Sequence, residues 1–292
     1  MYPEVLIIGC GFLGEAAADL FSTRGKSVLG LVRSPVSAMA ISSRFQEKQT
    51  GASFQIAVGD VTDHESVKAL TDQVRGVPLA IYSVSSGRGG AEAYAAVYRD
   101  GLRRVIEQWR PEKIIFVSST SVYGQSDASW VTEKSPTVSD RATSKILIDA
   151  ESIALNTGGS VARLSGIYGP GRSVLLRKFL SGEALLENGG GRWINQIHRD
   201  DAAAALVLLG RSDVSGGVFN ISDDTPATQG EVYGWIAEYL NCPLPPEGPA
   251  DFQRKRGWTS KRVSNALIRS LGWRPSFASY RDALPQLVEG RV

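Results

Sequence analysis

The sequence predicts an α/β protein with a doubly wound parallel sheet and a smaller, less regular C-terminal lobe. Two features of the 292 residues carry this prediction. Short apolar runs rich in β-branched residues alternate with longer amphipathic runs in the first half, whereas Gly/Pro loops interrupt the second half. Strands that alternate with helices form right-handed crossovers, which place parallel strands in one sheet covered by helices on both faces.

The individual elements follow from hydrophobic periodicity. A buried strand is a short continuous apolar run, and a surface helix repeats its apolar residues every three to four positions. We therefore expect strands at residues 5–8, 27–32, 54–58, 79–84, 114–117, 160–164 and 218–221. We expect helices at residues 12–24, 35–49, 63–75, 90–109, 139–156 and 202–209.

The chain is expected to divide into a sheet domain and a lobe. We assign residues 1–165 to the sheet domain, to which residues 196–222 return with a helix and a strand. Residues 166–195 and 223–292, which hold much of the Trp and Pro, are expected to form the lobe. We expect the lobe beside the carboxyl ends of the strands, because open α/β sheets bind their ligands there.

Composition and charge narrow the class of protein. Hydrophobic residues make up 42% of the chain, which is enough for one core. The net charge of +2 gives no reason to expect a nucleic acid or a membrane as partner. The two cysteines form no disulfide framework, which favours the cytoplasm. We expect no membrane span, which needs about 18 apolar residues, no signal peptide and no metal site.

A glycine-rich turn joins the first strand to the first helix. Residues 9–14 read Gly-Cys-Gly-Phe-Leu-Gly, a G-x-G-x-x-G spacing in the strand–helix context that gives it meaning. Gly9 permits the tight turn, Gly11 lets the backbone approach a diphosphate, and Gly14 allows close helix–strand packing. The helix N-terminus favours the phosphates. The spacing predicts a Rossmann-type dinucleotide site, and the alternative is a turn that needs glycine only for packing.

The end of the second strand bears on the choice of dinucleotide. NAD binders usually place a carboxylate there for the ribose 2′-OH, whereas this strand ends in Arg33-Ser34. A guanidinium suits a 2′-phosphate, so we expect NADP(H), with NAD(H) as the alternative and a solvated Arg33 as the structural interpretation. Asp60, at the end of the third strand, either holds the adenine amino edge or caps the helix that comes after it.

Several segments resemble the extended short-chain dehydrogenase/reductases, the group of nucleotide-sugar epimerases and dehydratases. These segments are residues 9–14, 59–61, 116–124, 163–171, 197–201 and 262–275. The resemblance implies an NAD(P)-binding epimerase (an isomerase) or oxidoreductase that takes a small molecule, and by analogy a homodimer. With the glycine turn, it implies cofactor contacts from Gly9, Gly11, Phe12, Leu13, Gly14, Arg33, Ser34, Asp60, Val61, Ser85, Lys145, Leu164 and Ile167.

The resemblance also implies catalytic residues, and one of them is replaced. Ser119 matches the position that polarises the substrate, and Lys145 matches the lysine of a Tyr-x-x-x-Lys motif. Arg141 stands where the tyrosine belongs, four residues before Lys145 on the same helix face. A guanidinium does not deprotonate in proteins, and losing a positioned general base typically costs about 10²–10⁴ in rate.

Three explanations of this replacement stay open. Another residue acts as base, with Tyr98, Tyr123 and Asp140 as candidates. Their structural interpretations are ordinary, since Tyr123 would pack in its turn and Asp140 would cap the helix. Alternatively, the enzyme runs a step that needs no tyrosine, or the chain is a catalytically silent NADP-binding protein with a regulatory or sensor role.

The lobe is implied to hold a nucleotide-sugar-like substrate through arginines on its diphosphate. The matching candidates are Arg172, Arg177, Arg192 and Arg262. The basic run at residues 254–256 beside Trp258 either clasps a phosphate with the ring on a base or is a solvated face. His198 is interpreted as a structural residue at the start of a helix.

Overall fold

The computed structural model describes residues 2–48, 53–87, 90–138, 140–252 and 258–290. The chain forms two compact units. Unit 1 comprises residues 1–122, 139–163 and 203–219, and unit 2 comprises residues 123–138, 164–202 and 220–292.

This division differs from the predicted one chiefly in residues 123–138 and 196–202, which belong to unit 2. The first of these segments holds strand β6 (Trp130–Val131), which pairs in parallel with β15 (Arg262–Val263). The second holds β11 (Gln196–His198), which pairs in parallel with β8 (Gly166–Tyr168). Both pairings tie their segments to the lobe, and neither is visible in the local sequence pattern.

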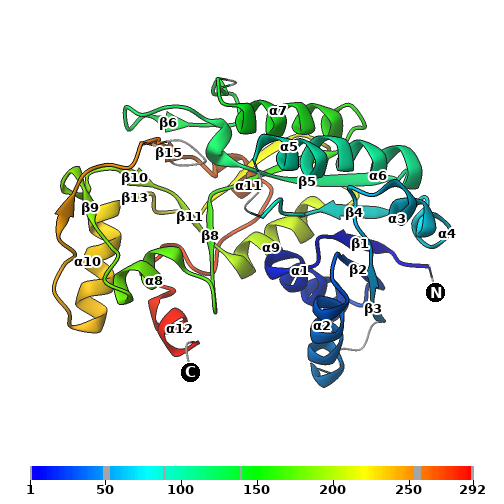
Figure 1. Ribbon diagram of the computed structural model, residues 1–292, viewed down its shortest axis with the longest axis horizontal. Helices are drawn as coiled ribbons and strands as arrows, with labels where there is room; N and C mark the ends of the chain where they lie inside the picture. The colour runs from blue at the N-terminus through cyan, green and yellow to red at the C-terminus, as the bar shows by residue number, and fades with distance from the viewer. Residues whose placement is uncertain (1, 49–52, 88–89, 139, 253–257, 291–292) are drawn as a thin grey trace. The chain divides into compact units, whose positions relative to one another are not determined.

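A seven-stranded sheet is the centre of the fold, with the strand order β12-β7-β5-β4-β1-β2-β3. The strands are β1 (Val5–Ile8), β2 (Val28–Val32), β3 (Phe54–Val58), β4 (Leu79–Tyr82), β5 (Lys113–Ser119), β7 (Ser160–Leu164) and β12 (Val218–Ile221). The pairs β1–β2, β2–β3, β1–β4 and β4–β5 are parallel. The predicted Rossmann-type fold class is therefore confirmed, and each predicted strand is present (Figure 1).

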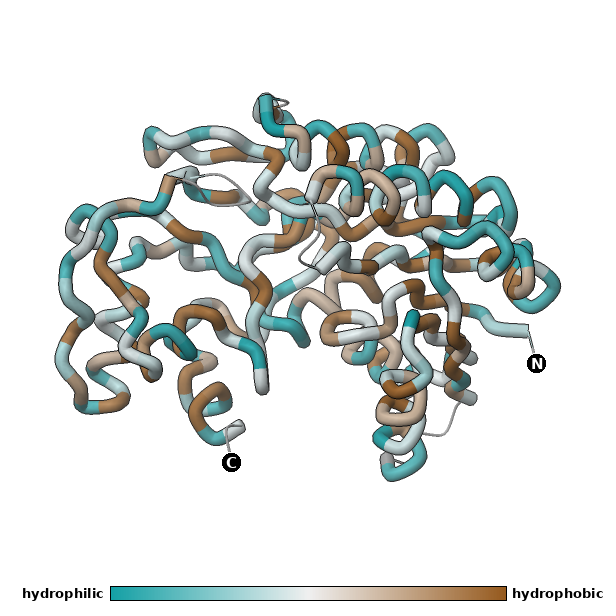
Figure 2. Tube along the Cα trace, viewed as in Figure 1, coloured by the Kyte–Doolittle hydropathy of each residue, from teal (hydrophilic) through white to brown (hydrophobic). Residues whose placement is uncertain are grey.

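The central strands explain why the sequence shows continuous apolar runs there. Every residue of β1, β2, β4 and β7 is buried, and Figure 2 shows the apolar colour along β1. Strands of a parallel sheet are covered by helices on both faces, so they carry apolar side chains on both sides instead of an alternating pattern.

Helices connect the strands of unit 1 close to where the sequence predicts them. They are α1 (Phe12–Thr23), α2 (Pro35–Lys48), α3 (His64–Ala69), α4 (Thr71–Val74), α5 (Ala91–Tyr94), α6 (Gly101–Trp109), α7 (Ala142–Leu155) and α9 (Arg199–Leu209), the last of which begins in unit 2. The helix expected at residues 63–75 is divided into α3 and α4.

The helix expected at residues 90–109 contains a π-helical segment at Ala95–Asp100 between α5 and α6. The Tyr82 hydroxyl donates to the Val97 carbonyl at 2.5 Å. A Cβ atom at Gly101 would lie 2.7 Å from the same hydroxyl. The wider turn therefore has a physical cause, because it gives a buried phenol a backbone acceptor beside a residue without a side chain.

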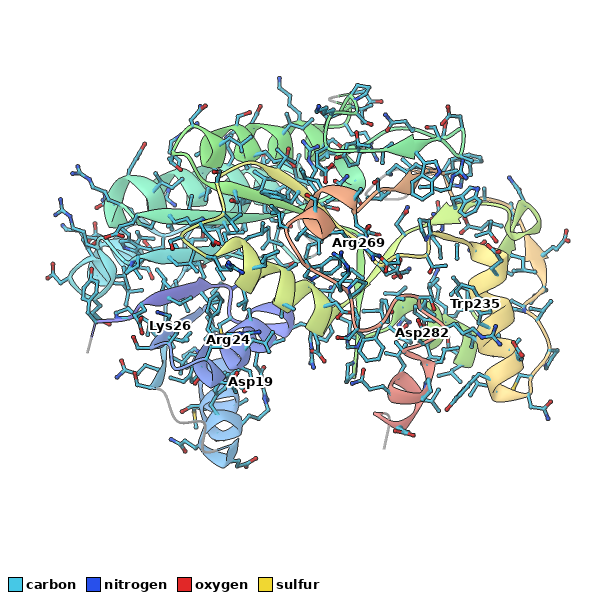
Figure 3. The ribbon with its side chains drawn as sticks, turned by 180° about the vertical axis from the view of Figure 1, so that it is seen from behind. Asp19, Arg24, Lys26, Trp235, Arg269 and Asp282 are labelled. Atoms are coloured by element: carbon cyan, nitrogen blue, oxygen red, sulfur yellow. The ribbon has the colours of Figure 1, made fainter. Side chains whose placement is uncertain are left out.

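Unit 2 is more regular than the sequence predicts. Besides its short paired strands it contains α8 (Val174–Leu180), α10 (Gln229–Leu240), α11 (Ala266–Ser270) and α12 (Leu284–Glu289). Thr228 begins α10 with a capping box, in which its hydroxyl accepts from the Glu231 N–H while the Glu231 carboxylate accepts from the Thr228 N–H. Ion pairs such as that of Arg269, labelled in Figure 3, with Asp224 join its segments.

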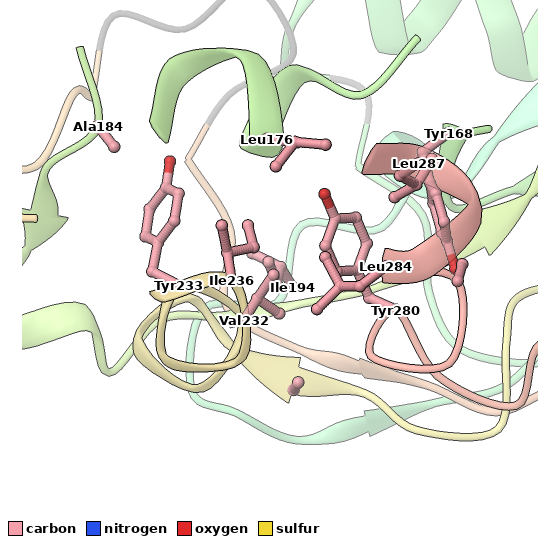
Figure 4. Packing of buried hydrophobic residues seen from close by; sticks show 12 residues of the cluster. Tyr168, Leu176, Ala184, Ile194, Val232, Tyr233, Ile236, Tyr280, Leu284 and Leu287 are labelled. Atoms are coloured by element: carbon pink, nitrogen blue, oxygen red, sulfur yellow. The ribbon is translucent and has the colours of Figure 1, made fainter. Parts of the chain in front are cut away.

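A separate apolar cluster holds unit 2 together. Tyr168, Leu176, Ile236, Tyr280 and Leu284 are among its buried members (Figure 4). They come from β8, α8, α10 and the C-terminal segment, so residues far apart in the sequence share one core. Among the described residues, no helix has the length and hydropathy that crossing a bilayer requires, and no group of three or more His, Cys, Asp or Glu side chains could hold a metal ion.

Candidate functional site

The glycine turn between β1 and α1 has the geometry that a diphosphate needs. Gly9 has a φ of 85°, and a Cβ atom there would lie 2.7 Å from the backbone of Val84. A Cβ atom at Gly14 would lie 2.5 Å from the Gly9 carbonyl oxygen. At Gly11, in contrast, no atom lies within 4 Å of the added Cβ. The first and third glycines are thus required by the fold, and the second leaves open space beside the backbone.

The start of α1 adds favourable electrostatics to this open space. Gly11 is the N-cap residue, and no side chain caps the helix. The N–H groups of the first turn therefore carry the partial positive charge that favours phosphate. Glu15, the acid of the first turn, forms a two-point ion pair with Arg44 at 2.6 and 2.7 Å. Cys10 is fully buried, and this burial raises the pKa of its thiol to about 12. The residues present fit a dinucleotide.

Arg33 and Ser34 lie at the carboxyl end of β2. Arg33 is exposed, and among the residues that the structure describes it has no hydrogen-bond or ion-pair partner. The Ser34 carbonyl accepts from the Ala38 N–H at 3.0 Å, and Pro35 occupies the first position of α2. An uncommitted guanidinium therefore stands beside the start of a 14-residue helix, where two features favour an anion.

The structure corrects one interpretation of Asp60. The N-cap of α3 is Asp63, whose carboxylate accepts from the Glu65 N–H at 3.0 Å, so Asp60 as the helix cap is wrong. Asp60 instead accepts from the N–H and the hydroxyl of Thr62 at 2.8 and 2.7 Å. Its predicted contact with adenine stays a prediction.

The remaining cofactor candidates of unit 1 include two residues on the loops after β3 and β4. Val61 is buried, and its carbonyl accepts from the Arg104 guanidinium. Ser85 is exposed, and its hydroxyl accepts from the Gly87 N–H at 3.3 Å. Phe12 and Leu13 form the first turn of α1. Their contacts with a cofactor stay predictions.

Ser119 and Arg141 both form a hydrogen bond with the backbone of Ser121 in unit 1. Ser119 ends β5, and its hydroxyl accepts from the Ser121 N–H at 3.2 Å. The Arg141 guanidinium donates to the Ser121 carbonyl at 3.0 Å. Arg141, predicted to stand at the position of the family tyrosine, thus lies at the segment that carries Ser119, as a permanent cation and a hydrogen-bond donor.

The start of α7 differs from the interpretation of Asp140 as a cap. Arg141 itself is the N-cap residue, with extended φ and ψ of −100° and 129° and no side-chain cap, so the capping role for Asp140 is wrong. The Asp140 carboxylate instead lies 3.9 Å from the Arg141 guanidinium. Lys145 is on the first turn of α7 and is exposed, whereas Ser144, Leu147 and Glu151 are among the buried residues of this helix.

The predicted lobe residues all lie in unit 2, in different surroundings. Leu164 ends β7 and is buried, and Ile167 is paired with Ile197 between β8 and β11. Arg172 is exposed in a tight loop in which Gly169 and Arg172 exchange backbone hydrogen bonds at 2.9 Å.

Two of the four predicted substrate arginines face carboxylates. Arg177 lies 3.7 Å from Glu183, and both side chains are exposed. Arg192 lies 3.4 Å from Glu187, and both are mostly buried. These pairs partly neutralise the positive charge that a diphosphate would need. The basic run at residues 254–256 lies outside the described residues.

Arg262 has different neighbours. Its Nε donates to the Ala128 carbonyl at 2.9 Å. Its Cζ atom lies over two indole rings, 5.2 Å from the centroid of Trp130 and 5.1 Å from that of Trp193. These distances are within the range of cation–π attraction.

Comparison with known proteins decides the family. Residues 5–222 match the sequence model of the NAD dependent epimerase/dehydratase family. This chain belongs to the NAD dependent epimerase/dehydratase family. A relative from a Streptomyces species, a 3-diazoavenalumate denitrifying reductase, is 26% identical over 319 residues, with 96% of this chain and 99% of that protein covered.

Solved structures with the same fold carry ligands of two kinds. MoeE5 in complex with UDP-glucose and NAD is 21% identical, with a TM-score of 0.78 over 98% of this chain and 97% of that chain. WbmG of Bordetella bronchiseptica in complex with NAD and UDP is 15% identical, with a TM-score of 0.81 over 99% of this chain and 94% of that chain. These likenesses confirm the fold that the resemblance implies.

In this epimerase/dehydratase-family chain, two of the alternative bases are enclosed. Tyr123 is fully buried, and its hydroxyl donates to the Asn220 side chain at 2.8 Å. Tyr98 is buried, with its ring centroid 4.7 Å from that of Tyr94 and 6.4 Å from that of Phe116. The packing interpretation of Tyr123 is confirmed, and burial argues against both phenols as the base.

The structural interpretation of His198 is confirmed as well. The side chain is fully buried between aromatic rings, with centroids 5.4 Å from Tyr168 and 4.1 Å from Phe277. Its Nδ1 accepts from the Asp200 N–H at 3.3 Å, directly at the start of α9. Burial lowers the pKa of its imidazole, which favours the neutral ring that this packing needs.

Sequence reasoning missed a buried charge network beside Ser119. The Glu151 carboxylate accepts from the Ser118 hydroxyl at 2.6 Å and from two nitrogens of Arg163 at 3.0 and 2.6 Å. Only 7% of the Arg163 side chain and 3% of the Glu151 side chain are exposed. The network joins β5, α7 and β7 next to the catalytic candidates. Its signal was a single arginine within the otherwise apolar strand at residues 160–164.

Proposed function

We propose that this chain is an NADP(H)-dependent enzyme of the family, an oxidoreductase or epimerase that acts on a nucleotide-sugar-like small molecule. The glycine turn carries the proposal, since Gly9 and Gly14 admit no side chain while Gly11 borders open space at the start of α1. The ligands named for MoeE5 and WbmG support a dinucleotide and a UDP-linked substrate. The cytoplasmic location and a homodimer stay predictions.

NADP(H) is preferred because of the residues at the carboxyl end of β2. Arg33 is exposed without an ion-pair partner among the described residues, and it lies two residues before the start of α2. A bidentate guanidinium suits the 2′-phosphate, whereas a carboxylate suited to a ribose 2′-OH is absent from this position.

The chain's own residues suggest how a reaction proceeds. When bound, the nicotinamide supplies a hydride donor or acceptor. Ser119 is placed to donate a hydrogen bond to a substrate oxygen. Arg141 stays protonated, so it stabilises negative charge on that oxygen and does not remove a proton. Lys145, on the exposed side of α7, keeps its predicted contact with the nicotinamide ribose. None of these residues exchanges a proton with the substrate, so the proton that reduction of a carbonyl consumes, or that oxidation of an alcohol releases, would be exchanged with water.

The test begins with calorimetric titration of the full chain with NADPH and NADH. We expect tighter binding of NADPH, and Arg33→Ala should weaken NADPH binding roughly 10- to 100-fold, the value of a charge-assisted hydrogen bond, while NADH changes little. Arg75→Ala, an exposed arginine of the same unit, is the matched control. Equal losses for both dinucleotides would remove Arg33 from this role.

A second candidate function, a silent NADP-binding sensor or regulator, is favoured by Arg141 in place of the base. Absorbance of the bound dinucleotide separates the two functions. An enzyme changes the redox state of the cofactor with at least one member of a panel of UDP- and dTDP-sugars. A silent protein binds NADPH with the same preference and leaves its absorbance unchanged across the panel.

A further inference from the structure

The guanidinium of Arg262 contacts aromatic rings, whereas those of Arg269 and Arg281 in the same unit contact carboxylates. Arg269 forms an ion pair with Asp224, and Arg281 lies 3.1 Å from Glu238. Arg262 makes no ion pair with any residue in the part of the chain that the structure describes, and two indole rings surround it instead. Its full positive charge is therefore held in place without being neutralised.

Three segments distant in the sequence fix the position of this guanidinium. Arg262 and Trp130 are register partners in the parallel pair β15–β6. The Arg262 Nε donates to the Ala128 carbonyl at 2.9 Å. The third segment contributes Trp193, whose N–H donates to the Ser260 hydroxyl at 3.1 Å, two residues before Arg262. The long side chain is thus ordered before any ligand arrives, which lowers the entropy cost of binding.

The contacts of Arg262 determine which of its groups stay available. Two rings lie within cation–π distance of Cζ, and Nε–H is used by the Ala128 carbonyl. The two Nη atoms have no hydrogen-bond partner among the described residues. They form the planar fork that matches a carboxylate or a phosphate. Trp130 is 54% exposed, so part of its ring is open to a second planar group.

We propose that Arg262, Trp130 and Trp193 form an anchor for a planar ring that carries a carboxylate or phosphate. The guanidinium binds the oxyanion through its Nη atoms, and the exposed indole stacks on the ring. The anchor rests on the proposed function and deepens it, because it assigns the ring-bearing anionic end of the substrate to these residues. A nucleoside monophosphate and an aromatic carboxylate share this chemistry.

Calorimetric titration of the full chain with UMP, 4-hydroxycinnamate and inorganic phosphate tests the anchor. At least one ring-bearing anion should bind more tightly than phosphate, and the tighter one identifies the source. Arg262→Gln should weaken that binding roughly 10- to 100-fold, because it removes a charge-assisted hydrogen bond. Arg281→Gln, an exposed arginine of the same unit, should leave it unchanged.

A second variant separates the ring from the anion. Trp130→Leu removes an exposed side chain and should weaken the ring-bearing anion about tenfold, as expected for one stacked base, without changing phosphate binding. The anchor is overturned if phosphate binds as tightly as both ring-bearing anions, or if Arg262→Gln and Trp130→Leu both bind like the unaltered chain.

Titration of the same samples with NADPH distinguishes failure of the anchor from failure of the proposed function. If titration with NADPH gives heat but ring-bearing anions bind no more tightly than phosphate, the anchor is contradicted and the proposed function is not. Absence of heat with NADPH in the unaltered chain would contradict the proposal that this chain binds the dinucleotide. Retained NADPH binding in Arg262→Gln also shows that this variant is folded.

Discussion

The glycine turn after β1 and the Ser119–Arg141 segment after β5 belong to the same unit. Backbone geometry determines the first, whereas the identity of the side chains determines the second. The glycine turn is dictated by the backbone, because Gly9 has a φ of 85° and a side chain at Gly14 would meet the Gly9 carbonyl at 2.5 Å. The second segment depends on side-chain identity, and its backbone accepts Arg141 in an extended N-cap conformation open to most residues. The proposed cofactor site is therefore set by backbone geometry, whereas the proposed catalytic site depends on a single side chain.

Glu151→Gln should destabilise the protein most among these variants, because it breaks the buried network beside the Ser119–Arg141 segment. Glu151→Gln removes the carboxylate that pairs with buried Arg163 and accepts from Ser118. Leaving a buried charge without its partner typically costs about 3–5 kcal/mol, so the free energy of unfolding should fall by that amount. Denaturant unfolding at pH 7 measures it. A loss below about 1 kcal/mol, the size of an exposed pair, would contradict a structural role for this network.

Asp223→Asn, which also replaces a buried carboxyl with an amide, is the control for Glu151→Gln. Asp223 is buried, and one of its oxygens has no hydrogen-bond partner among the described residues. Burial raises the pKa of Asp223 well above its ordinary value. Its folded-state pKa exceeds the unfolded value, so stability is lost as pH rises from about 4 toward the folded pKa. Asp223→Asn should therefore stabilise the protein at pH 8 and change little at pH 4, and the reverse order would contradict this interpretation.

Arg141→Met tests the proposed role of the guanidinium in the reaction. If Arg141 stabilises charge on a substrate oxygen, its loss should lower turnover of a productive sugar nucleotide by about 10²–10³, the cost of removing one oxyanion donor. The dissociation constant for NADPH should stay the same, because the glycine turn is untouched. Arg141→Lys, which keeps the charge, should recover part of the rate. Full activity in Arg141→Met would exclude this role.

The features that sequence reasoning predicted are local ones. The strands at residues 5–8, 54–58, 160–164 and 218–221 have the predicted bounds, because an apolar run between turns needs no distant partner to be visible. The glycine turn was equally visible, since a G-x-G-x-x-G spacing directly after an apolar run can be recognised locally, although the atoms that exclude a side chain at Gly9 belong to distant Val84. Helix α10 was missed because the whole tail was interpreted by its Trp and Pro content.

The features that sequence reasoning missed depend on long-range pairing. Ser118 and Glu151 are 33 residues apart in the chain, and Arg262 meets Ala128 across 134 residues. Neither contact leaves a periodic pattern, so only the fold brings these groups together. The two wrong capping interpretations, for Asp60 and Asp140, arose because helix boundaries shift by a few residues and a cap depends on the boundary.

Gly11→Leu tests whether the glycine turn holds the dinucleotide. The added side chain enters open space, since no atom lies within 4 Å of the Cβ position, so the variant should fold with an unchanged unfolding midpoint. The same side chain fills the place of the diphosphate, so calorimetric titration with NADPH should show heat for the unaltered chain and none for Gly11→Leu. Equal NADPH binding by the folded variant would contradict the assignment of this turn as the dinucleotide site.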